Sequence, residues 1–154
     1  MHFCYKLLTY FFYPLAHFYL FIRKLKKKEH SKRYREKLSS TKISRPQGFL
    51  LWFHVASVGE AMSILPLLES CIQEKKFNKI LITSITLSSG KILEKRFNQN
   101  PRVVHQFLPF DVPTLTNKFL DHWKPNLSIF IDSEVWPNLI LNTSKRKIPL
   151  LLIN

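Results

Sequence analysis

The 154-residue chain can hold one small domain, and its 45% hydrophobic content is typical of a protein that folds. Its net charge of +14 is concentrated in residues 1–47, which contain 12 Lys/Arg and 2 Asp/Glu, whereas a nucleic-acid-binding domain would carry such charge on its folded part. Two cysteines, Cys4 and Cys71, cannot form a disulfide framework, and the six histidines lack metal-ligand spacing. We therefore expect no nucleic-acid partner, no metal and no cofactor.

The first predicted element is a membrane-anchor helix within residues 1–22. Residues 3–22 are almost wholly apolar or aromatic, and as a helix they would extend about 30 Å, enough to cross a hydrocarbon core. Lys6, Pro14 and His17 interrupt this pattern. A helix that lies in the membrane interface is therefore an alternative, and so is an amphipathic helix of the domain itself.

A basic juxtamembrane segment, residues 23–47, comes next. Residues 23–37 contain nine basic and two acidic residues. The positive-inside rule keeps such a flank in the cytoplasm, and the same charges attract anionic headgroups. A cleaved signal peptide is not expected, because the charge follows the apolar stretch and no small-residue cleavage pattern is present.

Residues 48–154 alternate between strand and helix patterns, and we assign them to one α/β domain. Five apolar runs have the length of strands: residues 49–56, 79–85, 103–107, 126–131 and 148–153. Helical patterns separate them, at residues 60–76 and 88–97, from about Pro113, and at 137–147. Single helices between strands predict a Rossmann-like parallel sheet with helices on both faces.

Proline and aspartate mark two helix boundaries in this pattern. Pro66 lies inside the helical run 60–76 and predicts a kink or a late helix start. Asp111 precedes Pro113 by two residues. We expect Asp111 to cap that helix, because aspartate suits the N-cap and proline suits the first turn.

Polar segments follow the first four predicted strands. In parallel sheets of this kind, ligands bind beyond the carboxyl ends of the strands, so these segments would meet where a site is expected. The four segments are SVGE (57–60), TLSSGK (86–91), LPFD (108–111) and DSEVWPN (132–138).

Glu60 is the candidate general base. Its segment has one glycine and no lysine in the register of a phosphate-binding loop. Gly59 would permit a tight turn that directs the Glu60 carboxylate at the ligand edge, as a general base requires. The alternative is that Glu60 only caps its helix, in the positive end of the helix dipole.

Two further segments carry weaker indications. TLSSGK could present amides and hydroxyls to an anion, although capping by Ser88 explains the pattern equally well. In DSEVWPN, Asp132 and Glu134 could stabilise positive charge in a transition state or hold a cationic neighbour. The alternative for this pair is a solvated acidic loop.

Taken in order, these segments resemble a known family. The stretches are FHVASVGE, LITSITLSSGKILEKRF, HQFLPFDVP, IFIDSEVWPN and KRKIPLLLIN. They are similar to the N-terminal half of bacterial 3-deoxy-D-manno-octulosonic acid (Kdo) transferases, and the apolar N-terminus with its basic flank matches as well.

The resemblance implies half of a GT-B glycosyltransferase on the cytoplasmic side of the cell inner membrane. It implies inverting transfer of Kdo from CMP-Kdo to the lipid A precursor, lipid IVA. Glu60 would be the proton acceptor, Asp132 would stabilise the transition state, and Glu134 would support it. Substrate binding is assigned to small and polar residues of the same segments, namely Ser57, Gly59, Ser88, Ser89, Gly90 and Asn138.

The chain also departs from the family pattern. Asp132 and Ser133 stand where the family has Glu-Thr, which shortens one carboxylate by a methylene. The sequence ends before the family's second domain, which holds CMP-Kdo, so we expect a truncated acceptor domain and a separate chain that carries the donor domain. The alternative is a non-catalytic remnant or a lipid-A-binding module.

Overall fold

A five-stranded, wholly parallel sheet forms the centre of the protein in a computed structural model that describes residues 2–131 and 136–154. Its strand order is β3-β2-β1-β4-β5, which confirms the predicted Rossmann-like sheet. The strands are β1 (Leu50–Val55), β2 (Lys79–Ser84), β3 (Val103–Phe107), β4 (Leu127–Ile131) and β5 (Leu150–Ile153).

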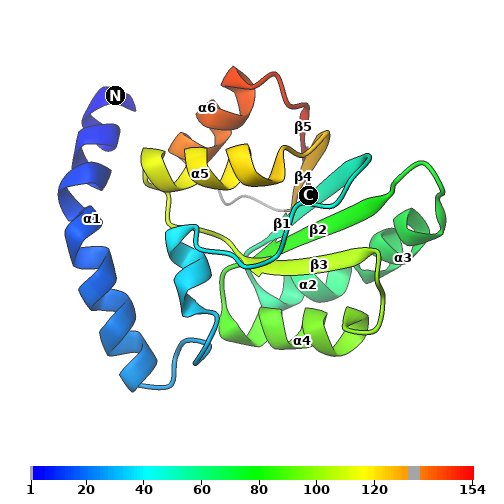
Figure 1. The fold of residues 1–154 in the computed structure, drawn as a ribbon, viewed down its shortest axis with the longest axis horizontal. Coiled ribbons are helices and arrows are strands. Elements are labelled where there is room, and N and C mark those ends of the chain that lie inside the picture. The colour runs from blue at the N-terminus through cyan, green and yellow to red at the C-terminus, as the bar shows by residue number, and fades with distance from the viewer. Residues whose placement is uncertain (1, 132–135) are drawn as a thin grey trace.

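Helices cover both faces of this sheet, as the alternating pattern predicted (Figure 1). One face carries α2 (Val58–Ser63), α3 (Leu65–Gln73) and α4 (Leu87–Phe97). The other face carries α5 (Pro113–Trp123) and α6 (Pro137–Lys145).

The central strand shows why the strands appear in the sequence as continuous apolar runs. All six residues of β1 are buried, because each side of the strand meets a helical layer. Leu51 and Phe53 pack into the cluster under α2, α3 and α4, and Leu50 and Trp52 pack under α5 and α6. The two clusters place the core on both sides of β1 and fix its carboxyl end between them.

The helix predicted at residues 60–76 is two helices. α2 ends at Ser63, Ile64 joins the two, and Pro66 lies in the first turn of α3. Proline is accepted there because the first turn needs no donor from its nitrogen. Of the two predicted effects of Pro66, a kink or a late helix start, the structure shows an interruption at Ile64 with a helix on either side.

The predicted role of Asp111 at α5 is wrong. α5 begins at Pro113 as expected, but its N-cap is Val112, and no side chain caps it. The Asp111 carboxylate instead accepts hydrogen bonds from the backbone N–H groups of Asn138 (3.0 Å) and Leu139 (2.8 Å), so it caps α6.

An N-terminal helix, α1 (His2–Leu25), stands beside the carboxyl edge of the sheet (Figure 1). Leu20 is buried against the domain, while most large apolar side chains of α1 are exposed. None of the helices in residues 2–131 and 136–154 combines the length and the apolar character that crossing a membrane requires.

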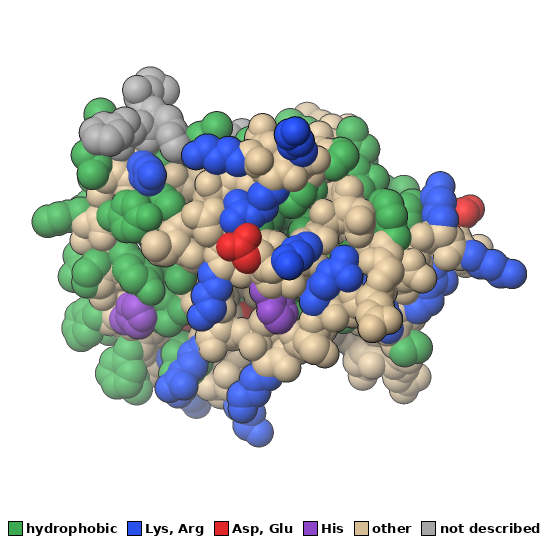
Figure 2. All heavy atoms as spheres, turned by 45° about the horizontal axis from the view of Figure 1, so that its top comes forward, with side chains coloured by type: hydrophobic (Ala, Val, Ile, Leu, Met, Phe, Trp, Pro, Cys, Tyr) green, Lys and Arg blue, Asp and Glu red, His purple; other side chains and the backbone are tan. Residues whose placement is uncertain are grey.

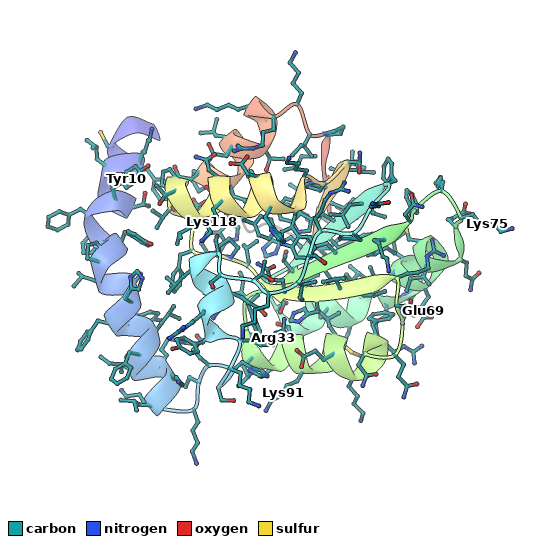
Figure 3. The ribbon with its side chains drawn as sticks, viewed as in Figure 1. Tyr10, Arg33, Glu69, Lys75, Lys91 and Lys118 are labelled. Atoms are coloured by element: carbon teal, nitrogen blue, oxygen red, sulfur yellow. The ribbon has the colours of Figure 1, made fainter. Side chains whose placement is uncertain are left out.

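Part of the basic segment is folded onto the domain. It contains a short 3-10 helix, η1 (Tyr34–Leu38), that the sequence did not predict. The buried Glu36 carboxylate of η1 accepts the Phe107 N–H at 2.9 Å. Arg33 lies between η1 and the β3–α4 region, pairing with Glu36 (2.7 Å) and Glu94 (Figure 3).

Candidate functional site

The strand order places a crevice at the carboxyl ends of β1 and β4. From β1 the chain proceeds to β2 and β3 on one side, and β4 and β5 lie on the other, so the order reverses at the β1–β4 boundary. Sheets of this type bind ligands outside the carboxyl ends at that point, because the following loops diverge and leave a gap.

A cavity of about 310 Å³ lies at this position. It is lined by Ser57, Gly59, Glu60, Ser63, Ile131 and Asn154. These residues come from α2 and its N-cap, from the end of β4 and from the residue that follows β5. Among the described residues, no three His, Cys, Asp or Glu side chains come together as a metal site would require.

Glu60 combines a structural contact with exposure to this cavity. Ser57 is the N-cap of α2, and its hydroxyl accepts the Glu60 N–H at 3.2 Å. Glu60 Oε2 in turn accepts the Ala56 N–H at 2.7 Å, in the manner of a capping box. In the described part of the chain, Oε1 has no hydrogen-bond partner, so it can take a proton from a ligand hydroxyl.

Gly59 does not form the tight turn expected for it. It is the second residue of α2, and only Gly48 among the glycines has a positive φ. A methyl group at Gly59 would meet nothing closer than Ser57 Oγ, at 3.9 Å. The glycine therefore leaves space in the cavity wall rather than bending the chain.

None of the TLSSGK residues is among those that line this cavity. Thr86, not Ser88, caps α4, and its hydroxyl accepts the Ser89 N–H at 3.1 Å. Ser88 is exposed, whereas Ser89 is fully buried. A methyl group at Gly90 would approach the Phe107 ring to 2.8 Å, so this glycine permits close packing of α4 on β3.

Asp132 and Glu134 lie outside the described residues. Ile131, which precedes them in the sequence, lines the cavity. Asn138 is buried, and its Nδ2 donates to the Asp111 carbonyl at 2.6 Å and to Thr9 Oγ1 at 3.3 Å. The structure thus brings Ser57, Gly59 and Glu60 together and places Asn138 in a separate buried network.

Sequence reasoning missed other residues at this edge. Ser63, a cavity residue, follows Glu60 by three positions on one helix, and helical spacing could have identified it. The position of Asn154 in the cavity wall and the contact of Asp111 with α6 both follow from the order of the strands in the sheet. The local pattern contains no indication of that order.

These features define the class of the protein: a Rossmann-like α/β domain with a carboxylate at the ligand-binding edge of its sheet. A family model described as "3-Deoxy-D-manno-octulosonic-acid transferase (kdotransferase)" matches residues 28–154, and the chain belongs to this family.

Individual relatives agree with this assignment. The chain is 41% identical over 151 residues to a probable mitochondrial 3-deoxy-D-manno-octulosonic acid transferase of Arabidopsis thaliana, covering 97% of this chain and 33% of the relative. It is 39% identical to the transferase of Rickettsia bellii, covering 97% and 35%. It is 31% identical to that of Haemophilus influenzae, covering 80% and 30%. The chain spans about a third of the length of the curated relatives it matches.

Proposed function

We propose that this chain is the acceptor-side domain of a Kdo transferase. It would act in transfer of Kdo from CMP-Kdo to the lipid A precursor in lipopolysaccharide biosynthesis. Family membership supports the reaction class, and a carboxylate oxygen at the β1–β4 crevice supports a role in the chemistry. The donor domain that holds CMP-Kdo, in the same protein or in a separate chain, would complete the site.

The observation that carries this proposal is the environment of Glu60. One oxygen is fixed by the Ala56 N–H, and the side chain lines an open cavity at the ligand edge. A sugar hydroxyl is a weak nucleophile, so inverting displacement at the donor needs a base beside the acceptor. Glu60 fits this role, with Asp132 as the group that stabilises the transition state and Glu134 as its support.

We also propose that α1 and the basic segment hold the protein at the cytoplasmic face of the inner membrane. Figure 2 shows hydrophobic side chains gathered at the end of the molecule where α1 lies. Ten large apolar residues of α1 are exposed: Leu7, Leu8, Tyr10, Phe11, Phe12, Leu15, Phe18, Tyr19, Phe21 and Leu25. A helix with such an apolar face lies in the plane of the membrane interface, with its apolar side at the boundary between the headgroups and the acyl chains.

Cations lie where lipid headgroups would meet such a helix. Lys24, near the end of α1, places its ammonium 4.6 Å from the centre of the Tyr34 ring in η1. Beside η1 is a hollow of about 420 Å³, which includes Lys32, Arg35 and Lys42 in its wall. Anionic headgroups are attracted to such clusters, by about 1 kcal/mol for each cation near the surface.

The test of the catalytic proposal is transfer of Kdo by the chain supplied with a donor domain. Glu60→Gln should lower the rate by roughly 10²–10⁴-fold, because glutamine keeps an oxygen for the Ala56 N–H but cannot accept a proton. Glu69→Gln is the matched control, since it makes the same change to a carboxylate of α3 that does not line the cavity, and its rate should stay within a few-fold of wild type.

One control and two opposing outcomes complete this test. Residues 1–154 without the donor domain should form no product, because positioning of the donor supplies a large part of the rate. A Glu60→Gln protein that is folded and transfers Kdo at the wild-type rate would refute the base assignment. No transfer by the wild-type chain with any donor domain would favour a non-catalytic lipid-A-binding module.

A further inference from the structure

The Asp111 carboxylate is a junction between three segments that are distant in the sequence. Its Oδ1 accepts the Leu139 N–H at 2.8 Å, and its Oδ2 accepts the Asn138 N–H at 3.0 Å. Oδ2 also accepts the phenol proton of Tyr5 at 3.0 Å. The carboxylate thus joins the segment after β3 both to the first turn of α6 and to α1.

The first turn of α6 depends on this carboxylate. Among residues 2–131 and 136–154, the N-cap residue Trp136 makes no side-chain capping bond, and the Asp111 carboxylate is the acceptor for the N–H groups of Asn138 and Leu139. Asp111 is only 6% exposed, so water does little to replace a lost donor. Removing the Tyr5 hydroxyl therefore changes the hydrogen bonding of a carboxylate on which the first turn of α6 depends.

Tyr5 keeps its proton under physiological conditions. Burial, followed by the charge of Asp111, raises the pKa of Tyr5 to about 12. A second contact, between Asn138 Nδ2 and Thr9 Oγ1, joins the same turn of α6 to α1 at 3.3 Å. Two side chains one helical turn apart therefore hold the N-terminal half of α1, Thr9 by a direct bond to α6 and Tyr5 through Asp111.

The other end of α1 is held independently. Arg23 pairs with the buried Glu29 at 2.6 Å, and Glu29 also pairs with Lys37 of η1 at 2.8 Å. With this end fixed, a shift of α1 on a surface acts as a tilt about Arg23 and Glu29. The contacts that such a tilt changes most are those of Tyr5 and Thr9 with Asp111 and Asn138.

We propose that Tyr5 and Asp111 form a positioning pair that couples the seating of α1 on a lipid surface to the N-terminus of α6 at the carboxyl edge of the sheet. The inference rests on the proposed membrane contact of α1. It assigns α1 a part in the order of the first turn of α6, beyond attachment. By linkage, a lipid surface that favours the docked position of α1 also favours the ordered first turn of α6.

The test is amide hydrogen exchange at Asn138 and Leu139, with and without vesicles containing phosphatidylglycerol. In the wild-type protein, vesicles should slow exchange at both amides. Tyr5→Phe removes one hydrogen bond and keeps the ring, so without vesicles it should speed exchange at both amides by about two- to tenfold. It should also abolish the effect of vesicles on them.

Tyr10→Phe is the matched control. Tyr10 is an α1 tyrosine that is 39% exposed, and no hydrogen bond engages its hydroxyl in the described part of the chain (Figure 3). In Tyr10→Phe, the amides of Asn138 and Leu139 should exchange as in wild type. Wild type, Tyr5→Phe and Tyr10→Phe should co-sediment with vesicles to the same extent.

Three results would overturn the coupling. One is wild-type exchange at Asn138 and Leu139 that vesicles leave unchanged, and another is a vesicle effect that persists in Tyr5→Phe. The third is a wild-type protein that does not co-sediment with vesicles, which would also refute the membrane proposal. Co-sedimentation is a separate measurement, so failure of the coupling alone can be recognised.

Discussion

At the scale of single residues, the Glu60 carboxylate combines a capping contact with exposure to the candidate cavity. The bond from the Ala56 N–H uses one carboxylate oxygen and holds the side chain in place. A base must be positioned before its reaction, because orientation in advance reduces the cost of reaching the transition state. The capping contact therefore supports the proposed role of Glu60 rather than competing with it.

The side chains of His54 and His105 are buried as neutral groups. His105 packs under η1, and burial, followed by the charge of Arg33, lowers its pKa to about 3. Arg33 Nη2 lies 3.2 Å from His105 Nδ1. A guanidinium can only donate, so this contact requires an unprotonated Nδ1. Burial likewise lowers the pKa of His54 to about 4.

We expect these histidines to make the protein less stable as the pH falls below about 6.5. From there down to about 4, the unfolded chain binds protons that the folded protein does not bind, so the free energy of unfolding decreases with decreasing pH. Each histidine contributes at most about 1.4 kcal/mol per pH unit. Thermal unfolding between pH 7 and pH 4.5 measures this slope.

His105→Gln separates the histidine effect from that of the carboxylates. Glutamine can still bond to Ser84 and Arg33 but does not titrate, so the variant should have a shallower slope than wild type. Glu94, Glu36 and His30 also face this site, and they remain in both proteins. Equal slopes in the two proteins would contradict the assignment.

At the scale of elements, the two glycines of the predicted site differ in their physical role. Gly90 sits where α4 touches β3, and a methyl group there would meet Phe107 at 2.8 Å and His105 at 3.1 Å. Gly59 faces open space beside Ser57 in α2. One glycine maintains the packing of two elements, and the other leaves room in the cavity.

Alanine substitution distinguishes these roles. Gly90→Ala should destabilise the protein by about 1–3 kcal/mol, the usual cost of overpacking. Gly59→Ala should be neutral or stabilising by about 0.4–1 kcal/mol, since the backbone there suits alanine. Chemical unfolding of both variants measures the difference. A Gly90→Ala protein as stable as wild type would show that α4 can move away from β3 without cost.

The elements also show what local sequence can predict. Continuous apolar runs identified all five strands to within two residues at each end, because buried parallel strands need such runs. Pro113 and Pro137 located the starts of α5 and α6. These are signals that a few neighbouring residues contain.

Contacts between distant segments could not be predicted in the same way. Asp111 and Pro113 have the spacing of a local cap, yet the carboxylate bonds to α6. The reason is topological, since α5 crosses from the edge strand β3 to β4 and so starts next to α6. η1 escaped prediction because its cations suggested a solvated linker, whereas Arg33 and Glu36 pair and become partly or wholly buried.

At the scale of the whole molecule, the apolar face of α1 and the candidate site share one side of the protein. α1 stands beside the carboxyl edge of the sheet, where Glu60 lies (Figure 1). An acceptor with a lipid part would reach the cavity most directly from a surface that α1 also contacts. The arrangement agrees with the proposed acceptor.

Replacing exposed aromatic residues of α1 tests this arrangement. Phe11 and Phe18 are 77% and 64% exposed, so Phe11→Ser with Phe18→Ser should leave the fold intact. Burying each ring in a membrane contributes about 1.5–3 kcal/mol, so vesicle binding should weaken by at least about tenfold. Co-sedimentation with anionic vesicles measures the effect, and raised salt should weaken it further.

The control replaces an exposed apolar residue elsewhere. Leu67, on α3, is 39% exposed, and Leu67→Ser should bind vesicles as wild type does. Equal loss in both proteins would point to non-specific adhesion and contradict a specific role for α1.

The central position of β1 has a consequence for how the chain folds. Leu51 of β1 pairs with Ile80 of β2 on one side and with Leu127 of β4 on the other. Pairing of residues so far apart in sequence is slow, because the intervening chain must lose its conformational freedom before the contact forms. During synthesis, β1, β2 and β3 can associate while β4 is still absent. One edge of this fully buried strand stays open through that interval, and the arrival of β4 is expected to be the step that limits the folding rate.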